Sequence, residues 1–130
     1  MPVQPTRERI RAIVIDDDED SSDSICQALE ISGINVIGKG FDGEQAYQLY
    51  KTLLPDVVIL DMQMPNYDGA YALEKIKQNY PTAKIIVVTG FTDYTFEKEH
   101  ADAIFTKPYD LEPFIEMVNK IALDIPTIVK

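Results

Sequence analysis

In the segment Val57-Val58-Ile59-Leu60-Asp61, four apolar residues run directly into a carboxylate. An uninterrupted apolar run of this length is typical of a strand buried on both faces, as in a parallel sheet. Asp61 then lies where the strand ends and a loop begins. Ligand sites in open α/β sheets lie outside the carboxyl ends of the strands, so Asp61 is the first candidate functional residue.

Four further segments predict strands, and helical segments alternate with them. The expected strands cover residues 12–15, 35–38, 57–60, 84–88 and 103–106. Apolar residues at helical spacing predict helices between them: one that Gly33 ends, then 42–53, 70–79 and 110–125. Parallel strands need crossover connections, and right-handed crossovers put helices on both faces of the sheet. The sequence therefore predicts a three-layer α/β/α sandwich, with strand order 2-1-3-4-5 as the first choice.

Composition restricts the partners and the compartment. The chain has 130 residues, enough for one domain with a real core, and a net charge of −10, which argues against direct nucleic-acid binding. Cys26 is the single cysteine, in an apolar helical stripe, so we expect a core thiol and a reducing compartment. No signal peptide or membrane-crossing run is visible, and we expect a cytoplasmic protein.

The domain organisation expected from the sequence is simple. Residues 1–10 are polar and predict a flexible N-terminal arm, residues 11–125 predict the domain, and residues 126–130 predict a short tail. No linker or repeat interrupts this pattern, so we expect no output domain in the chain.

Polar residues collect at the predicted strand ends. The first strand supplies Asp16 and Asp17, the third Asp61, the fourth Thr89 and the fifth Lys107. In the predicted strand order these ends meet at one edge, where crowded carboxylates either raise the pKa of at least one of them or demand a cation. Oxygen ligands favour Mg²⁺ or Mn²⁺. With a hydroxyl and an ammonium group, the edge would suit a transferring phosphoryl group, and Gly90 would leave the approach open.

Four motifs together resemble the receiver domain of two-component response regulators. They are IVIDDD at 13–18, VVILDMQMPNYDG at 57–69, IIVVTG at 85–90 and FTKP at 105–108. The resemblance implies the flavodoxin-like fold, with Asp61 as the phosphoacceptor. It also implies a Mg²⁺ (or Mn²⁺) site formed by Asp16, Asp17, Asp61 and the backbone carbonyl of Gln63. Finally, it implies phosphoryl-binding and switch roles for Thr89, Gly90 and Lys107, and a cis Lys107–Pro108 bond.

The same resemblance implies a function. A sensor histidine kinase or phosphotransfer protein would donate the phosphoryl group to Asp61, and the resulting change of shape would alter binding to a downstream protein that the sequence does not identify. We expect a monomer or weak dimer, and no enzymatic activity beyond self-phosphorylation from phosphodonors and autodephosphorylation.

Two features depart from the family pattern. The position of the family's switch aromatic holds Ile104, and strand alternation puts Phe105 on the opposite face. Lys107 follows Thr89 by only 18 positions, about one helical turn fewer than the family has, which predicts a shortened fourth helix.

Three alternatives stay open. The chain could be a receiver-like binding module that is not phosphorylated, an interpretation that Ile104 and the short fourth helix support. It could be a Mg²⁺-dependent phosphatase with an aspartyl nucleophile, although Gln63 stands where such enzymes carry a general acid. A flavin protein fits least, because acidic residues replace the phosphate-binding loop after the first strand.

Overall fold

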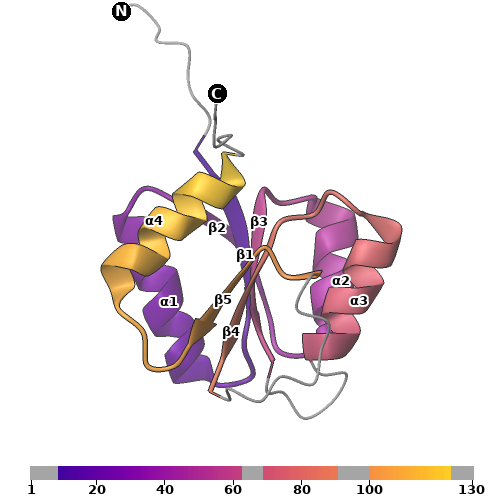
Figure 1. The fold of residues 1–130 in the computed structure, drawn as a ribbon, viewed down its shortest axis with the longest axis horizontal. Helices are drawn as coiled ribbons and strands as arrows, with labels where there is room; N and C mark the ends of the chain where they lie inside the picture. Colours follow the sequence, from indigo (N-terminus) through magenta and orange to yellow (C-terminus); the bar gives the residue numbers. More distant parts are fainter. Residues whose placement is uncertain (1–8, 63–68, 91–99, 124–130) are drawn as a thin grey trace, which may run out of the picture.

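The computed structural model describes residues 9–62, 69–90 and 100–123, which form a parallel sheet between two layers of helices (Figure 1). The elements in chain order are β1 (Arg11–Ile15), α1 (Glu19–Ile31), β2 (Asn35–Gly40), α2 (Gly43–Leu53), β3 (Val57–Asp61), α3 (Gly69–Asn79), β4 (Ile85–Thr89), β5 (Ala103–Thr106) and α4 (Leu111–Ala122). In these ranges, no helix is long and apolar enough to cross a bilayer.

The predicted sheet topology is confirmed. All four strand pairs are parallel, and the order is β2-β1-β3-β4-β5. Figure 1 shows α1 and α4 on one face of the sheet and α2 and α3 on the other, as right-handed crossovers require. The carboxyl ends of the strands therefore share one edge, at the bottom of the view.

Side chains alternate between two cores along the central strands. Val58 and Leu60 of β3 join the core under α2 and α3, whereas Val57 and Ile59 join the core under α1 and α4. Both faces are buried, so every residue of β3 and β4 is buried. This explains the unbroken apolar runs, because neither face of these strands meets water.

Local capping fixes where the helices begin and end. The α1 helix starts at Glu19, and Asp18 is its N-cap, with Oδ2 accepting a hydrogen bond from Ser21 N at 3.2 Å. Asp18 has the extended backbone conformation that is usual for an N-cap residue. As predicted, Gly33 ends the helix region, with a positive φ of 89°.

The second strand is longer than expected. β2 continues to Gly40 instead of ending at 38, because it pairs with β1 as far as Ile15. The pairing shifts between Ala12 and Ile13, where β2 contains one extra residue. Leu53 and Leu49 of α2 pack closely over Gly38, 3.0 and 3.3 Å from the position that a Cβ atom would occupy.

Three sequence expectations fall outside the described residues. They are the shortened fourth helix, which would lie within 91–99, the loop residue Gln63, and the continuation of the last helix to Ile125. The described part of the last helix ends at Ala122, with Leu123 as its C-cap.

Candidate functional site

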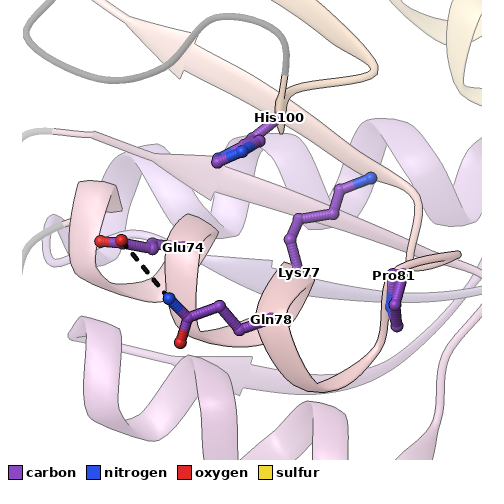
Figure 2. A pocket seen from close by; sticks show the side chains of 5 residues that line it. All are labelled: Glu74, Lys77, Gln78, Pro81 and His100. Atoms are coloured by element: carbon purple, nitrogen blue, oxygen red, sulfur yellow. Dashed lines mark hydrogen bonds between the residues drawn. The ribbon is translucent and has the colours of Figure 1, made fainter.

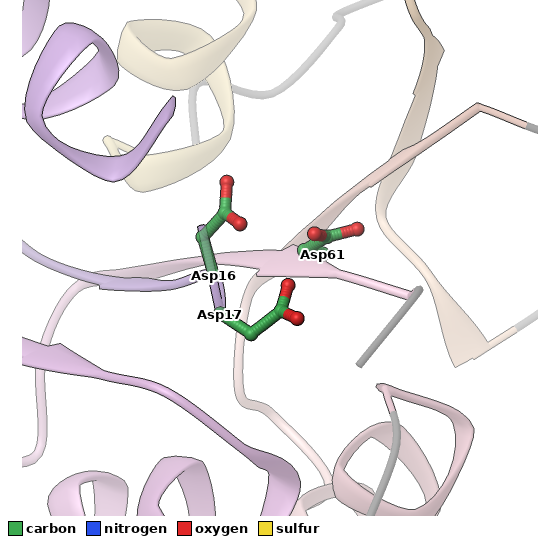
Figure 3. A group of neighbouring side chains, drawn as sticks. All are labelled: Asp16, Asp17 and Asp61. Atoms are coloured by element: carbon green, nitrogen blue, oxygen red, sulfur yellow. The ribbon is translucent and has the colours of Figure 1, made fainter. Parts of the chain in front are cut away.

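Three carboxylates from two strands meet at the carboxyl edge of the sheet. Asp16 and Asp17 follow β1, and Asp61 is the last residue of the neighbouring strand β3 (Figure 3). One oxygen from each of the three lies within 4.8 Å of the others. The predicted convergence of these acids is therefore confirmed, although they are 45 positions apart along the chain from Asp16 to Asp61.

Three residues that directly follow a strand are hydrogen-bonded through the main chain to the neighbouring strand. Asp16 N donates to Gly40 O at 3.1 Å, Met62 N to Val88 O at 3.2 Å, and Lys107 N to Thr89 O at 2.8 Å. A side-chain bond adds to this, because Asp18 N donates to Oδ1 of Asp16 at 2.9 Å. These bonds fix the positions from which the polar side chains project.

Burial gives the three carboxylates different environments. Asp16 and Asp61 are only 2% and 4% exposed, whereas Asp17 is exposed. Buried carboxylates at this spacing repel one another unless a cation compensates them. The structure supplies one such cation, since Lys107 Nζ lies 3.8 Å from Oδ2 of Asp61.

The donor set fits a small divalent ion. Two oxygens bound to one ion at about 2.1 Å cannot be more than about 4.2 Å apart. Carboxylates already within 4.8 Å need only small side-chain rotations to share an ion. All three donors are oxygens, the ligands that Mg²⁺ and Mn²⁺ prefer, so the Asp16–Asp17–Asp61 cluster could hold such a metal.

The remaining predicted site residues border this cluster. Thr89 ends β4, the strand next to β3, and is buried with 2% exposure, and Gly90 follows it at an exposed bend. The Lys107–Pro108 peptide bond is cis. Ile104 packs on the α2–α3 side of the sheet and Phe105 on the opposite side, so the strand alternation expected there is confirmed.

Sequence reasoning missed Tyr109. Burial raises the pKa of its hydroxyl, and the neighbouring charges of Asp16 and Asp61 raise the pKa further. Its position two residues after Lys107, shortly beyond the end of β5, was the signal that could have placed it beside the site.

Gly69 is a second residue whose importance the sequence only hinted at. A Cβ atom there would lie 2.5 Å from Met62 Sδ and 2.6 Å from Asp61 O. The start of α3 therefore packs directly on the backbone that carries Asp61, and only glycine fits at this contact.

A hollow lies near the opposite edge of the sheet from the carboxylate cluster. Figure 2 shows Glu74, Lys77 and Gln78 of α3 facing it, together with Pro81 and His100. Lys77 Nζ donates to Ala83 O at 2.6 Å and to Oδ2 of Asp102 at 3.1 Å, just before β4 and β5 begin. Because Lys77 serves these structural contacts, we place no function in this hollow.

The single cysteine has a structural role. Cys26 packs against the core under α1 and α4, and burial raises the pKa of its thiol. A raised pKa lowers the thiolate fraction and with it the reactivity of the thiol. Cys26 is only partly buried, so it lies at the margin of the core and not within it as expected.

The fold and the cluster define a flavodoxin-like α/β protein with an acidic centre at the carboxyl edge of its sheet. Residues 12–119 match the family model of the response regulator receiver domain. The protein CcdB of Bacillus subtilis is 33% identical over 115 residues, covering 85% of this chain and 96% of CcdB. This chain therefore belongs to the response regulator receiver domain family, whose members are signalling modules of two-component systems.

Two more similarities show how the domain is used elsewhere. One similar structure is the response regulator TrrA of Thermotoga maritima, solved in complex with Mg²⁺ and BeF. The two structures superpose with a TM-score of 0.81 at 26% sequence identity, and the match covers 86% of this chain and 98% of TrrA. The transcriptional regulatory protein DegU of Brevibacillus brevis is 28% identical over 94% of this chain, which spans 54% of DegU.

Proposed function

We propose that Asp61 accepts a phosphoryl group and that the modified domain changes its binding to another protein. The observation that carries this proposal is the position of Lys107 Nζ, 3.8 Å from the Asp61 carboxylate, beside two further carboxylates suited to a divalent ion. A carboxylate nucleophile between a cluster suited to a divalent ion and an ammonium group is an arrangement that favours phosphoryl transfer.

The proposed transfer is a nucleophilic substitution at phosphorus. An Asp61 oxygen forms a bond to the phosphorus of a phosphohistidine on a sensor kinase or phosphotransfer protein, and the phosphorus–nitrogen bond breaks. Its electron pair stays on the imidazole, which takes up a proton. Lys107 pairs with a phosphoryl oxygen, and the Thr89 hydroxyl donates to another.

Asp16, Asp17 and Asp61 would hold Mg²⁺ or Mn²⁺, with the Gln63 carbonyl proposed as a further ligand outside the described residues. When bound, the ion would neutralise charge on the phosphoryl oxygens. TrrA, solved with Mg²⁺ and BeF, supports this proposal by analogy.

We further propose that the domain turns over no other substrate and that it functions with the boundaries expected from the sequence, residues 11–125.

The test is intact-mass spectrometry after incubation with acetyl phosphate and Mg²⁺. We expect wild-type protein to gain one phosphoryl group, and the gain to disappear without the divalent ion or in Asp61→Asn. Asp20→Asn is the matched control, because it removes an exposed acid from the first turn of α1 without touching the cluster. Equal labelling of Asp61→Asn and wild type would contradict the assignment, and no labelling of wild type would favour the non-phosphorylated binding module.

A further inference from the structure

An aromatic cluster links the carboxylate site to the α1–α4 side of the molecule. Phe105, Tyr109 and Phe114 form this cluster: the Phe105 and Phe114 rings meet edge to face at 5.3 Å, and Tyr109 lies 5.0 Å from Phe114 and 5.7 Å from Phe105. These separations lie in the range of favourable aromatic pairs. The cluster therefore connects the end of β5 with the interior face of α4.

Strand alternation places the acceptor on this same side. Val57 and Ile59 face the core under α1 and α4, and Asp61 continues their alternation along β3. Ile104, by contrast, faces α2 and α3. Asp61 thus lies on the same side of the sheet as the aromatic cluster, the α1–α4 side. On the α2–α3 side, position 104 carries only an aliphatic side chain.

An apolar groove lies on the outer side of the same two helices. It has a volume of about 490 Å³ and is lined by Ala28 and Ile31 of α1 and by Leu111 and Ile115 of α4. Ile31 is 83% exposed and Leu111 is 48% exposed. Exposed aliphatic side chains that gather in one groove are typical of a binding surface rather than of scattered surface residues.

The charges beside the groove indicate what would bind there. Glu112 and Glu116 line it, and no lysine or arginine does so among the described residues. The whole chain carries a net charge of −10. The complementary partner is therefore a segment that combines aliphatic side chains with lysine or arginine.

The α4 helix is suited to connect the cluster with the groove. Phe114 points into the core with 0% exposure, while Leu111 and Ile115 of the same helix line the groove. The N-cap Asp110 makes no side-chain hydrogen bond to the first turn, whereas Asp18 and Asp42 cap α1 and α2 in this way. The first turn of α4 thus lacks the side-chain cap that holds α1 and α2, and a movement of Phe114 would act on this turn.

We infer that the α1–α4 groove binds a basic amphipathic helix of a partner protein, and that the Phe105–Tyr109–Phe114 cluster transmits the state of Asp61 to this groove. The inference rests on the proposed function for its trigger, but the groove itself can be tested without it.

The test uses a fluorescent model helix of leucine and lysine, titrated by anisotropy into the full chain with and without Mg²⁺ and beryllofluoride. We expect the treatment to change the affinity by about fivefold or more. Ile31→Asp should weaken binding by about tenfold, while the matched control Leu54→Asp, an exposed apolar residue at the end of α2, should leave it unchanged. A leucine–glutamate helix should not bind.

A variant of the cluster tests the connection. Phe105→Leu should still gain the phosphoryl group from acetyl phosphate but should lose the difference in affinity between treated and untreated protein. The methyl NMR signals of Ile31, Leu111 and Ile115 should shift on treatment of the wild type and stay in place in this variant.

The contrary outcomes are separable. If wild type gains the phosphoryl group but the groove methyl signals and the peptide affinity do not respond, the inference is wrong and the proposed function stands. If wild type gains none, the proposed function is wrong, and Ile31→Asp still tests the groove in untreated protein. Dimerisation in sedimentation velocity that Ile31→Asp abolishes would overturn the partner assignment in favour of a second copy of this chain.

Discussion

The ammonium group of Lys107 lies 3.8 Å from Oδ2 of Asp61, although β4 separates the strands that carry these two residues. The pair is asymmetric, because the Asp61 side chain is 5% exposed and the Lys107 side chain is 34% exposed. A partly hydrated lysine adds little to folding. It can, however, turn toward a new anion on Asp61, which is the role that the proposed function gives it.

Replacing this lysine should separate metal binding from phosphoryl transfer. In Lys107→Met we expect labelling by acetyl phosphate to slow by about tenfold to a hundredfold, because one charge-assisted contact to the phosphoryl oxygens is lost. Mg²⁺ should bind at least as tightly as in the wild type, since a competing cation is removed. Time-resolved intact mass and a Mg²⁺ titration measure the two effects, and unchanged labelling would contradict the role of Lys107.

Removing one carboxylate should stabilise the metal-free protein. Asp17 lies within 4.8 Å of Asp16 and Asp61, so Asp17→Asn relieves repulsion and should raise the melting temperature in EDTA by about 2–5 °C. Added Mg²⁺ should stabilise the wild type and have a smaller effect on the variant. Thermal melts with EDTA and with Mg²⁺ check this, with Asp20→Asn as control, and an equal response of variant and wild type to Mg²⁺ would exclude Asp17 as a ligand.

Gly69→Ala should damage the site as well as the fold. The new methyl group would meet the backbone of Asp61 and Met62, and we expect a loss of about 1–3 kcal/mol in unfolding free energy. Gly33→Ala should lose about 1 kcal/mol for a different reason, backbone strain at φ 89° in open space. Urea unfolding measures both, and only Gly69→Ala should also impair labelling of Asp61.

A buried tyrosine predicts how stability depends on alkaline pH. Burial raises the pKa of Tyr50, and the neighbouring Tyr80 and Asp56 raise it further. The unfolded chain then ionises first, near pH 10, so this contribution to stability is complete below that pH and is lost as the pH rises through the folded pKa.

Tyr50→Phe keeps the ring and removes the ionisation, so its unfolding free energy should fall less between pH 9 and pH 11 (about one unit on either side of the ordinary tyrosine value). Urea unfolding across this range measures the difference. Tyr109, whose pKa is also raised, should keep part of the pH dependence in the variant. Parallel curves for wild type and variant would contradict the assignment to Tyr50.

The topology could be predicted because strand and helix signals were strong where burial was complete. The run that ends at Asp61 is buried along its whole length, and an unbroken apolar run has few other interpretations. The strand-end acids followed from that topology alone. What failed was local: β2 runs to Gly40 because pairing with β1 and packing against α2 outweigh the weak strand propensity of glycine.

The Tyr109 and Gly69 contacts could not be predicted, for a different reason. Each depends on a packing distance: Tyr109 lies near Asp16 and Asp61, which are far from it in the chain, and Gly69 meets the Asp61 backbone across a turn of the chain. Periodicity predicts which face a residue occupies, but it does not predict which atoms of another segment it meets.

The main-chain bonds beyond the strand ends, from Asp16 to Gly40 and from Lys107 to Thr89, have an evolutionary consequence. They anchor Asp16 and Lys107 to the scaffold before the connecting loops begin. Natural variation or protein engineering could therefore change the length of those loops while these strand-end residues stay in place.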